Sequence, residues 1–324
     1  MASIFQKGYS MQKDHSLEKK GGVFKRLGKD IVMNRYVYLM LLPVIVYYVL
    51  FSYLPLYGAQ IAFRRFSPGL GILGSPWVGF ANFENFFGSI YFFRLIRNTL
   101  AINFLMIIFG FPAPIFLALL LNEVGFTPFK RLVQTITYMP HFISIIVISG
   151  MILNFFARDG LINNIIALFS NTPRPNYMLE AQWFRPIYVM SDIWQHVGWG
   201  TIIYLSALSA VDPQLYEASV IDGAGRWKQL LHVTLPGIAP TIIILFILRL
   251  GSMMTIGSEK ILLLYNANTY ETADVISTFV YRKGIMEADF SYSSAVGLFN
   301  SVINFIILLT ANRVSRTVSS TSLW

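Results

Sequence analysis

Few side chains in this sequence combine in the way that catalysis or metal binding requires. The four histidines lie in separate segments, without the close spacing of a metal-ligand set: His15, His141, His196 and His232. The chain has no cysteine, which excludes disulfides, thiolate nucleophiles and cysteine metal sites. It lacks the Gly-x-x-x-x-Gly-Lys-Ser/Thr pattern that cradles nucleotide phosphates, and no Ser/His/Asp arrangement comes with a supporting motif. We therefore expect no enzymatic activity, and no metal or cofactor bound by this chain.

Arg249 is the charged side chain in the most unusual position. It lies well inside the apolar stretch 233–258. A charge at the centre of a membrane costs about 2.5–3.5 kcal/mol on insertion scales, so Arg249 should face other helices or a water-filled cavity. One role is structural, a bond to Asp192, to Glu259 or to backbone carbonyls freed at a proline. The other is functional, contact with hydroxyls or a carboxylate of a solute in the cavity, through the two-pronged guanidinium.

A polar interval at residues 212–236 separates two apolar stretches. Asp212 can cap a short helix that starts at Pro213, and Gly223 can end it in the left-handed conformation. A second polar helix over about 224–234 then meets Pro236, which forbids its simple continuation. The sequence predicts a bent pair of short helices, suited either to a cleft on another protein or to a plain connection between membrane helices.

The surrounding elements must be membrane helices. The 324 residues are 55% hydrophobic and 13% charged, against roughly 25% charged in an ordinary soluble domain. Six runs are long enough to span, since a crossing needs about 20 mainly apolar residues. They cover residues 36–63, 98–122, 132–157, 193–211, 233–258 and 290–312. We therefore predict an all-α integral membrane protein with six transmembrane helices.

The basic residues favour both termini in the cytoplasm. The segments that lie inside under this orientation hold 14 Lys or Arg in 77 residues, and the opposite segments hold 10 in 100. Residues 1–35 would be a basic cytoplasmic tail, either disordered or lying on anionic lipid. Residues 36–324 would form the transmembrane domain, with residues 212–236 on the cytoplasmic side.

Specific motifs extend this interpretation. Glu217-Ala218-Ser219, three residues, Gly223, nine residues, Val233, one residue, Leu235-Pro236 resembles the EAA loop of bacterial ABC importer permeases, with Ser219 and Val233 as mild departures. Further segments resemble the carbohydrate importers of this family, in the branch that handles complex oligosaccharides such as alginate fragments. They are residues 57–63, 110–114, 138–144, 191–194, 269–275 and 322–324.

The resemblance implies a function and a set of partners. The chain would be a permease subunit in the bacterial inner membrane, with the fold of type I importers. It would pair with a second permease, two ATPase subunits that bind ATP and Mg, and a periplasmic solute-binding protein that delivers oligosaccharide; membrane lipid would surround it, and no nucleic acid is involved. Residues 212–236, which we name the coupling loop, would contact the ATPase through Glu217, Ala218, Ser219, Asp222, Gly223, Leu235 and Pro236.

The substrate path and a rival function complete the expectations. Candidate residues of the path are polar groups in or beside the apolar runs: Arg249, Asp192, Gln195, Asn300 and Asn304.

The alternative to an ATP-driven importer is an ion-gradient-driven secondary transporter, which needs an internal repeat or a relay of charges. We see no convincing repeat, and Arg249 is the sole charge well within a run.

Overall fold

The computed structural model describes residues 30–169, 175–318 and 322–323. The described chain is helical and contains no strand, apart from an isolated antiparallel bridge between Arg64 and Trp77. The predicted all-α class is therefore confirmed. Most of the predicted cytoplasmic tail, residues 1–29, lies outside the described residues. The chain divides into two units, Met1–Gly58 and Ala59–Trp324.

The described part of the first unit is an apolar helix with little to pack against within the unit. It contains α2 (Arg35–Tyr48), the π-helical turn η1 (Val49–Tyr53) and α3 (Leu54–Leu56), and none of these elements has a buried residue. A helix that is hydrophobic all round needs lipid or protein around it. This unit is therefore built for an apolar environment.

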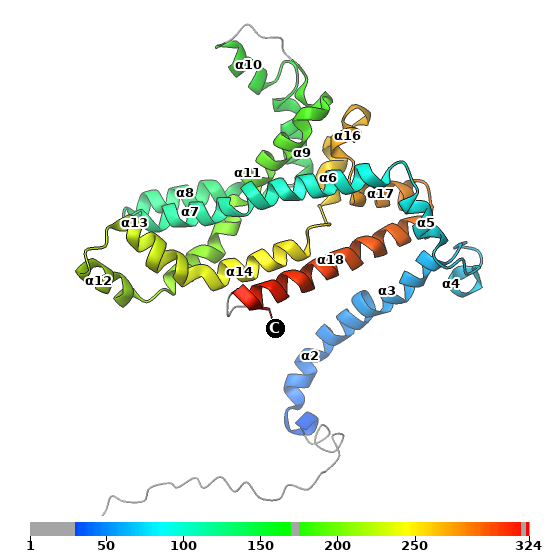
Figure 1. The fold of residues 1–324 in the computed structure, drawn as a ribbon, viewed down its shortest axis with the longest axis horizontal. Coiled ribbons are helices and arrows are strands. Elements are labelled where there is room, and N and C mark those ends of the chain that lie inside the picture. Colours follow the sequence, from blue (N-terminus) through cyan, green and yellow to red (C-terminus); the bar gives the residue numbers. More distant parts are fainter. Residues whose placement is uncertain (1–29, 170–174, 319–321, 324) are drawn as a thin grey trace, which may run out of the picture. The chain divides into compact units, whose positions relative to one another are not determined.

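The second unit contains the remaining helices, shown in Figure 1. In chain order after η2 (Tyr57–Phe63), which joins the units, they are α4 (Gly71–Gly74), α5 (Ala81–Phe87), α6 (Phe92–Leu105), η3 (Met106–Gly110), α7 (Pro112–Glu123), α8 (Thr127–Tyr138), η4 (Met139–Phe142), α9 (Ile145–Phe155), α10 (Leu161–Ala167), η5 (Tyr177–Leu179), α11 (Ala181–Ser209), α12 (Pro213–Ile221), α13 (Arg226–Gln229), η6 (Leu230–Thr234), α14 (Leu235–Gly251), α15 (Ser258–Leu264), η7 (Ala267–Thr269), α16 (Tyr270–Ala273), α17 (Ile276–Tyr281), η8 (Arg282–Met286) and α18 (Phe290–Val318).

The long helix α11 organises this unit. It packs along α7 and also contacts α8 and α14, while α14 packs against α18; Figure 1 shows α11 crossing α6–α7 and α14. The crossing with α8 is close, because a Cβ atom on Gly198 would lie 2.1 Å from the carbonyl oxygen of Thr137. Only glycine allows two backbones to approach in this way.

Within the described residues, four helical stretches are long and apolar enough to cross a membrane. They are Arg35–Phe63, Phe92–Glu123, Arg226–Gly251 and Phe290–Thr317. The third predicted run is not straight, because Thr127–Phe142 and Ile145–Phe155 meet at 100°, and it adds a fifth candidate only as one broken span. The fourth predicted run lies in α11, which starts at Ala181 rather than at 193 and is less apolar. The six-span arrangement stays a prediction.

Three prolines sit in continuous helices because a π-helical turn precedes each of them by the same offset. The turns Val49–Tyr53, Met106–Gly110 and Leu230–Thr234 come immediately before Leu54-Pro55, Phe111-Pro112 and Leu235-Pro236. The N–H of Phe111 donates to Met106, and that of Leu235 to Leu230, five residues back. The wider turn moves away the carbonyl that would otherwise clash with the proline ring.

Two predicted boundaries are corrected by these observations. The second helix of the coupling loop does not end at Pro236, because residues 226–251 form one helix through the π turn. The fifth apolar run does not extend as a helix to 258, since α14 ends at Gly251 and residues 252–257 form a connection to α15.

A buried ionic cluster around Asp274 joins α6 to the helices near the C-terminal end of the chain. Asp274 is fully buried, and its Oδ2 accepts hydrogen bonds from Arg94 at 3.0 Å and from Arg282 at 2.8 Å. Its Oδ1 accepts one from Thr278 at 2.9 Å, and its backbone carbonyl accepts one from Asn98 at 2.9 Å. One carboxylate therefore ties α6 to α16 and α17.

Candidate functional site

The first half of the coupling loop folds as the sequence predicts. Asp212 caps α12, with its Oδ1 accepting from the N–H of Gln214 at 2.9 Å, and Pro213 is the first helical residue. Gly223 follows the helix with a φ of +73°, a left-handed conformation that favours glycine. The cap and the glycine thus fix both ends of the helix through interactions between residues that are close in sequence.

A hydrogen bond holds the two arms of the coupling loop together. The hydroxyl of Tyr216 on α12 donates to Thr234 Oγ1 on the second arm, at 3.0 Å.

Ser219 stands where the family motif has alanine. Its hydroxyl donates to the Tyr216 carbonyl at 2.7 Å within the same helix. The departure is therefore accommodated without disturbing the outer surface of the loop.

The outer surface of the coupling loop carries apolar side chains exposed to solvent. Ile221 is 87% exposed and Trp227 is 78% exposed, and Leu215 and Val220 are also exposed. Among the predicted contact residues, Glu217, Ala218, Asp222, Gly223 and Pro236 are exposed, whereas Ser219 and Leu235 are half-buried. Exposed apolar side chains on a polar segment are typical of surfaces that contact protein or membrane.

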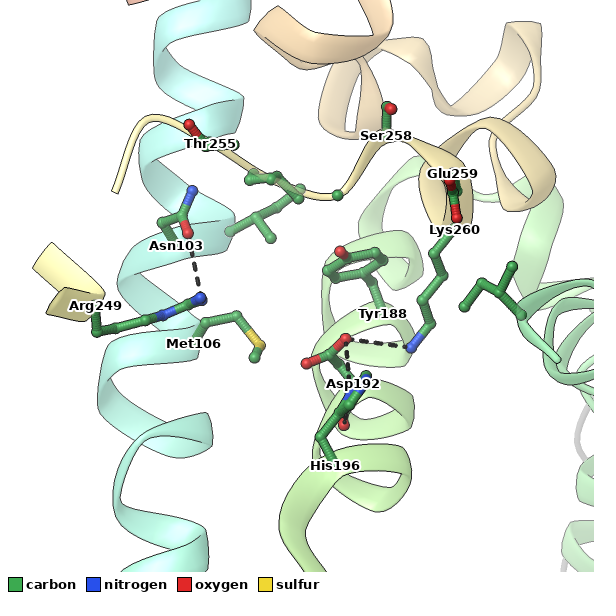
Figure 2. Close-up of a pocket in the computed structure, with 14 residues that line it drawn as sticks. Asn103, Met106, Tyr188, Asp192, His196, Arg249, Thr255, Ser258, Glu259 and Lys260 are labelled. Atoms are coloured by element: carbon green, nitrogen blue, oxygen red, sulfur yellow. Dashed lines mark hydrogen bonds and ion pairs between the residues drawn. The ribbon is translucent and has the colours of Figure 1, made fainter. Parts of the chain in front are cut away.

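A charged pocket lies near the other end of the helix that leaves the coupling loop (Figure 2). Its volume is about 370 Å³, within the usual range of roughly 300–1,000 Å³ for ligand sites. Its walls come from α6, η3, α9, α11, α14, α15 and the connection between the last two. The lining residues are Ile102, Asn103, Met106, Ile145, Tyr188, Asp192, His196, Arg249, Thr255, Ile256, Gly257, Ser258, Glu259 and Lys260.

Asp192 is the centre of the charges in this pocket. Its Oδ1 lies 3.7 Å from Nζ of Lys260 and 3.5 Å from Nδ1 of His196, one turn along α11. The Lys260 side chain is only 5% exposed, and its Nζ also lies 5.2 Å from the centre of the Tyr188 ring. The carboxylate thus neutralises a buried ammonium that comes from another helix.

Arg249 enters the pocket from the opposite side to Lys260 (Figure 2). Its Nη2 donates to Oδ1 of Asn103 at 3.4 Å, and Asn103 in turn donates to the Thr99 carbonyl at 3.1 Å. The hydrogen-bond partner in the structure is therefore a neutral amide, not the predicted Asp192 or Glu259. Arg249 faces a cavity, as the insertion cost requires.

A second cavity, of about 380 Å³, adjoins the first. The two share Met106, Asp192, His196 and Arg249, so these side chains stand where the cavities meet. The first cavity continues along residues 255–260, beyond α14, and the second along residues 245–252, on the side of the coupling loop. The charged side chains therefore form part of the wall of both cavities.

Asn304 supports the pocket from outside. Its Oδ1 accepts from the N–H of Met254 at 2.7 Å, and its Nδ2 donates to Thr255 Oγ1 at 2.7 Å. Ser277 adds a bond to the Ile256 carbonyl at 2.9 Å. The connection 252–257, which forms one wall of the pocket, is thus held by α17 and α18.

The predicted substrate-path residues therefore have different positions. Asp192 and Arg249 line both cavities, and Asn304 supports a wall. Gln195 and Asn300 line neither cavity. Sequence reasoning missed Lys260 and Asn103. Lys260 follows Glu259 just after an apolar run, so in sequence it looks like an ordinary external flank, and Asn103 gives no signal within its run.

The fold and the site define a class: an integral membrane transport component, with an exposed loop near one end of a helix and a polar cavity near the other. The chain belongs to the family described as "Binding-protein-dependent transport system inner membrane component", which matches residues 110–320. The predicted ABC importer permease is thereby confirmed. The chain is a non-catalytic multi-pass component of the inner membrane, and ATP hydrolysis resides in separate subunits.

Two relatives and two solved structures are similar over almost the whole chain. The polygalacturonan/rhamnogalacturonan transport system permease protein YteP of Bacillus subtilis (strain 168) is 46% identical, with 90% of this chain and 91% of that protein covered. The protein LplB of the same strain is 45% identical, with 87% and 89% covered. A chain of a bacterial alginate ABC transporter, crystallised with a periplasmic protein bound to alginate pentasaccharide, superposes with a TM-score of 0.85 at 42% identity, over 92% of this chain and all of that one. A second structure, of an ABC transporter that imports the acidic polysaccharide alginate, gives 0.84 at 43% identity, with 91% and 99% covered.

Proposed function

We propose that this chain is one of two permease subunits of an ATP-driven importer of oligosaccharides, acidic ones in particular. The relative YteP belongs to a polygalacturonan/rhamnogalacturonan transport system, and the two solved structures are of alginate transporters. All three polysaccharides contain uronic acids. The pocket of this chain presents Arg249 and Lys260, cations suited to carboxylates. The second permease, two ATPase subunits that bind ATP and Mg, and a periplasmic solute-binding protein complete the assembly, with membrane lipid around it.

The proposal includes six transmembrane helices and cytoplasmic termini. The tail 1–35 and the coupling loop then lie on the ATPase side, and residues 36–324 form the permease domain. The excess of Lys and Arg on that side supports the orientation. The coupling loop contacts the ATPase through Glu217, Ala218, Ser219, Asp222, Gly223, Leu235 and Pro236.

The observation that carries the proposal is the continuity of one helix between the two sites. Residues 226–251 run from the coupling loop to Arg249 without a break, a span of about 39 Å at 1.5 Å per residue. The connection 252–257 then leads directly to Lys260. Movement of the loop with the ATPase is transmitted to the wall of the pocket, where it changes access to the two cavities.

The direct test is uptake by the assembled complex in proteoliposomes. The complex should accumulate labelled trigalacturonate or an alginate trisaccharide only when ATP is enclosed on the ATPase side and the solute-binding protein is on the other. Uptake driven by a proton or sodium gradient without ATP would favour the secondary transporter and overturn the proposal.

The coupling role has its own test. Glu217→Lys reverses an exposed charge, and like charges at an interface cost several kcal/mol. The variant should insert and fold normally while ATP hydrolysis no longer responds to substrate. Glu84→Lys, an exposed reversal outside the loop, is the matched control. A normal ATPase response in Glu217→Lys would contradict the coupling role.

A further inference from the structure

The ammonium of Lys260 is unusually placed for a buried cation. Its side chain is almost fully buried, yet its Nζ makes no hydrogen bond with any described residue. The contact with Asp192 at 3.7 Å is an ion pair too long for a hydrogen bond. An ammonium carries three N–H donors, and burying them unbonded is costly. Lys260 therefore has unused hydrogen-bond donors at the wall of the pocket.

The second cation of the pocket is also incompletely matched. The hydrogen bond from Arg249 goes to the neutral amide of Asn103. The carboxylate of Asp192 is shared between Lys260 and His196, and Glu259, the other acid of the lining, is exposed to solvent. Two cationic side chains, Arg249 and Lys260, thus share one partly buried carboxylate, that of Asp192, and the pocket can accept a further negative charge.

We propose that Lys260 is the residue that selects acidic sugars: its ammonium exchanges Asp192 for a carboxylate of the oligosaccharide, while Arg249 contributes a second cation across the pocket. In this proposal Asp192 is an internal substitute for the substrate carboxylate. It keeps the lysine charged and in position between transport cycles. The flexible lysine stem permits the exchange without movement of the backbone.

The geometry supports an exchange rather than a permanent structural bridge. A structural pair in a low-dielectric site needs close contact and further hydrogen bonds to offset desolvation, and the Lys260–Asp192 pair has a long contact and an unbonded ammonium. Asp192 and Arg249 also stand where the two cavities meet. A carboxylate held there would lie against the wall that the two cavities share.

The inference rests on the proposed function, and uptake kinetics test both. Trigalacturonate and its carboxyl-reduced trisaccharide are the probes, each assayed with the same solute-binding protein, so that its own preference cancels between variants. Lys260→Gln should raise the KM for trigalacturonate at least about tenfold, since hydrogen bonds to charged groups contribute roughly that much. Uptake of the reduced sugar should not change. Lys260→Arg should retain most of the preference.

The direction in which the KM for trigalacturonate changes in Asp192→Asn distinguishes an exchanging carboxylate from a structural ion pair. Asp192→Asn removes the internal competitor and should leave unchanged or lower the KM for trigalacturonate. The double variant should behave like Lys260→Gln. Lys283→Gln removes a lysine that pairs with Glu287 outside the pocket, and it should leave both sugars unaffected.

Three results would overturn the inference. If both single variants lose uptake of both sugars and the double variant recovers it, the pair is structural. If wild-type protein imports only the reduced sugar, oligosaccharide import stands and the carboxylate site is wrong. If wild-type protein imports neither, the proposed function fails with it. If Lys260→Gln does not assemble, the other two variants still test the inference. Lys260→Arg keeps the positive charge, and the double variant removes both the positive and the negative charge of the pair.

Discussion

The coupling loop and the charged pocket lie at opposite ends of one helix, but different contacts hold them in place. Within the coupling loop, the Asp212 cap, the Gly223 turn and the Tyr216–Thr234 bond join residues at most 18 positions apart. In the pocket, Arg249 meets Asn103 across 146 positions, and Asn304 holds Met254 across 50. Damage to the loop should therefore stay local, whereas damage to the supports of the pocket should spread.

The largest effect is expected at Asp274, the carboxylate of the buried ionic cluster. Asp274→Ala leaves two guanidiniums without their partner, and breaking such a buried pair costs about 3–5 kcal/mol. The detergent-solubilised protein should lose thermal stability by this margin in a melting experiment. Glu287→Ala breaks the partly exposed pair with Lys283 and should cost about 0–1 kcal/mol. Equal effects of the two variants would mean that the buried cluster does not hold the helices.

Next in size is Asn304, which supports the wall of the pocket. Asn304→Leu removes two hydrogen bonds to residues 254 and 255, together about 1–3 kcal/mol. The expected result is weaker uptake with a raised KM, while basal ATP hydrolysis and binding of the ATPase persist. Ser301→Ala, on the exposed side of the same helix, is the control and should have no effect. Loss of ATPase binding in Asn304→Leu would show that a change at the pocket also disturbs the coupling loop, and would contradict the expected separation of the two regions.

Gly223 tests the local character of the coupling loop. A side chain at its φ of +73° costs about 1–2 kcal/mol, and a β-branched one more. Gly223→Val should therefore distort the loop and abolish substrate-stimulated ATP hydrolysis, with thermal stability nearly unchanged. The same substitution at Gly225, where φ is −73° and nothing lies within 4 Å of an added Cβ, should be tolerated. If both variants lose stimulation equally, side-chain bulk rather than backbone conformation is responsible.

The smallest effect is expected from Tyr216→Phe. It removes one hydrogen bond, to Thr234, worth about 0.5–1.5 kcal/mol. The affinity for the ATPase should fall by up to about tenfold, while transport per bound complex stays normal. A titration of the permease with ATPase subunits measures this change. An unchanged affinity would show that the two arms are held by their backbone connection alone.

Several local features could be predicted from the sequence. The helical class, the cap at Asp212, the left-handed Gly223 and the exposed position of Glu217 depend on one residue and its near neighbours. The effect of Pro236 was predicted wrongly, although it too is local. Proline does forbid the ordinary hydrogen bond, but a π-helical turn, which no residue type requires, gave the helix another way to continue.

The pocket could be predicted only in part. Arg249 and Asp192 were recognisable because a charge in or beside an apolar run has to find water or a partner. Their neighbours Asn103 and Lys260 were not, since they reach the pocket from two other helices. Gln195 has the same polar character in sequence, but its position on α11 turns it away from both cavities.

The sequence by itself determined the membrane character, the coupling-loop motif and the need to shelter Arg249, because hydropathy, turn preference and the cost of a buried charge act over short stretches of chain. The tertiary structure decided which groups meet. Only helix packing brought Lys260 to Asp192 and gave Arg249 a neutral partner. Contacts between residues 50 or more positions apart depend on the path of the whole chain, and no local pattern in the sequence specifies them.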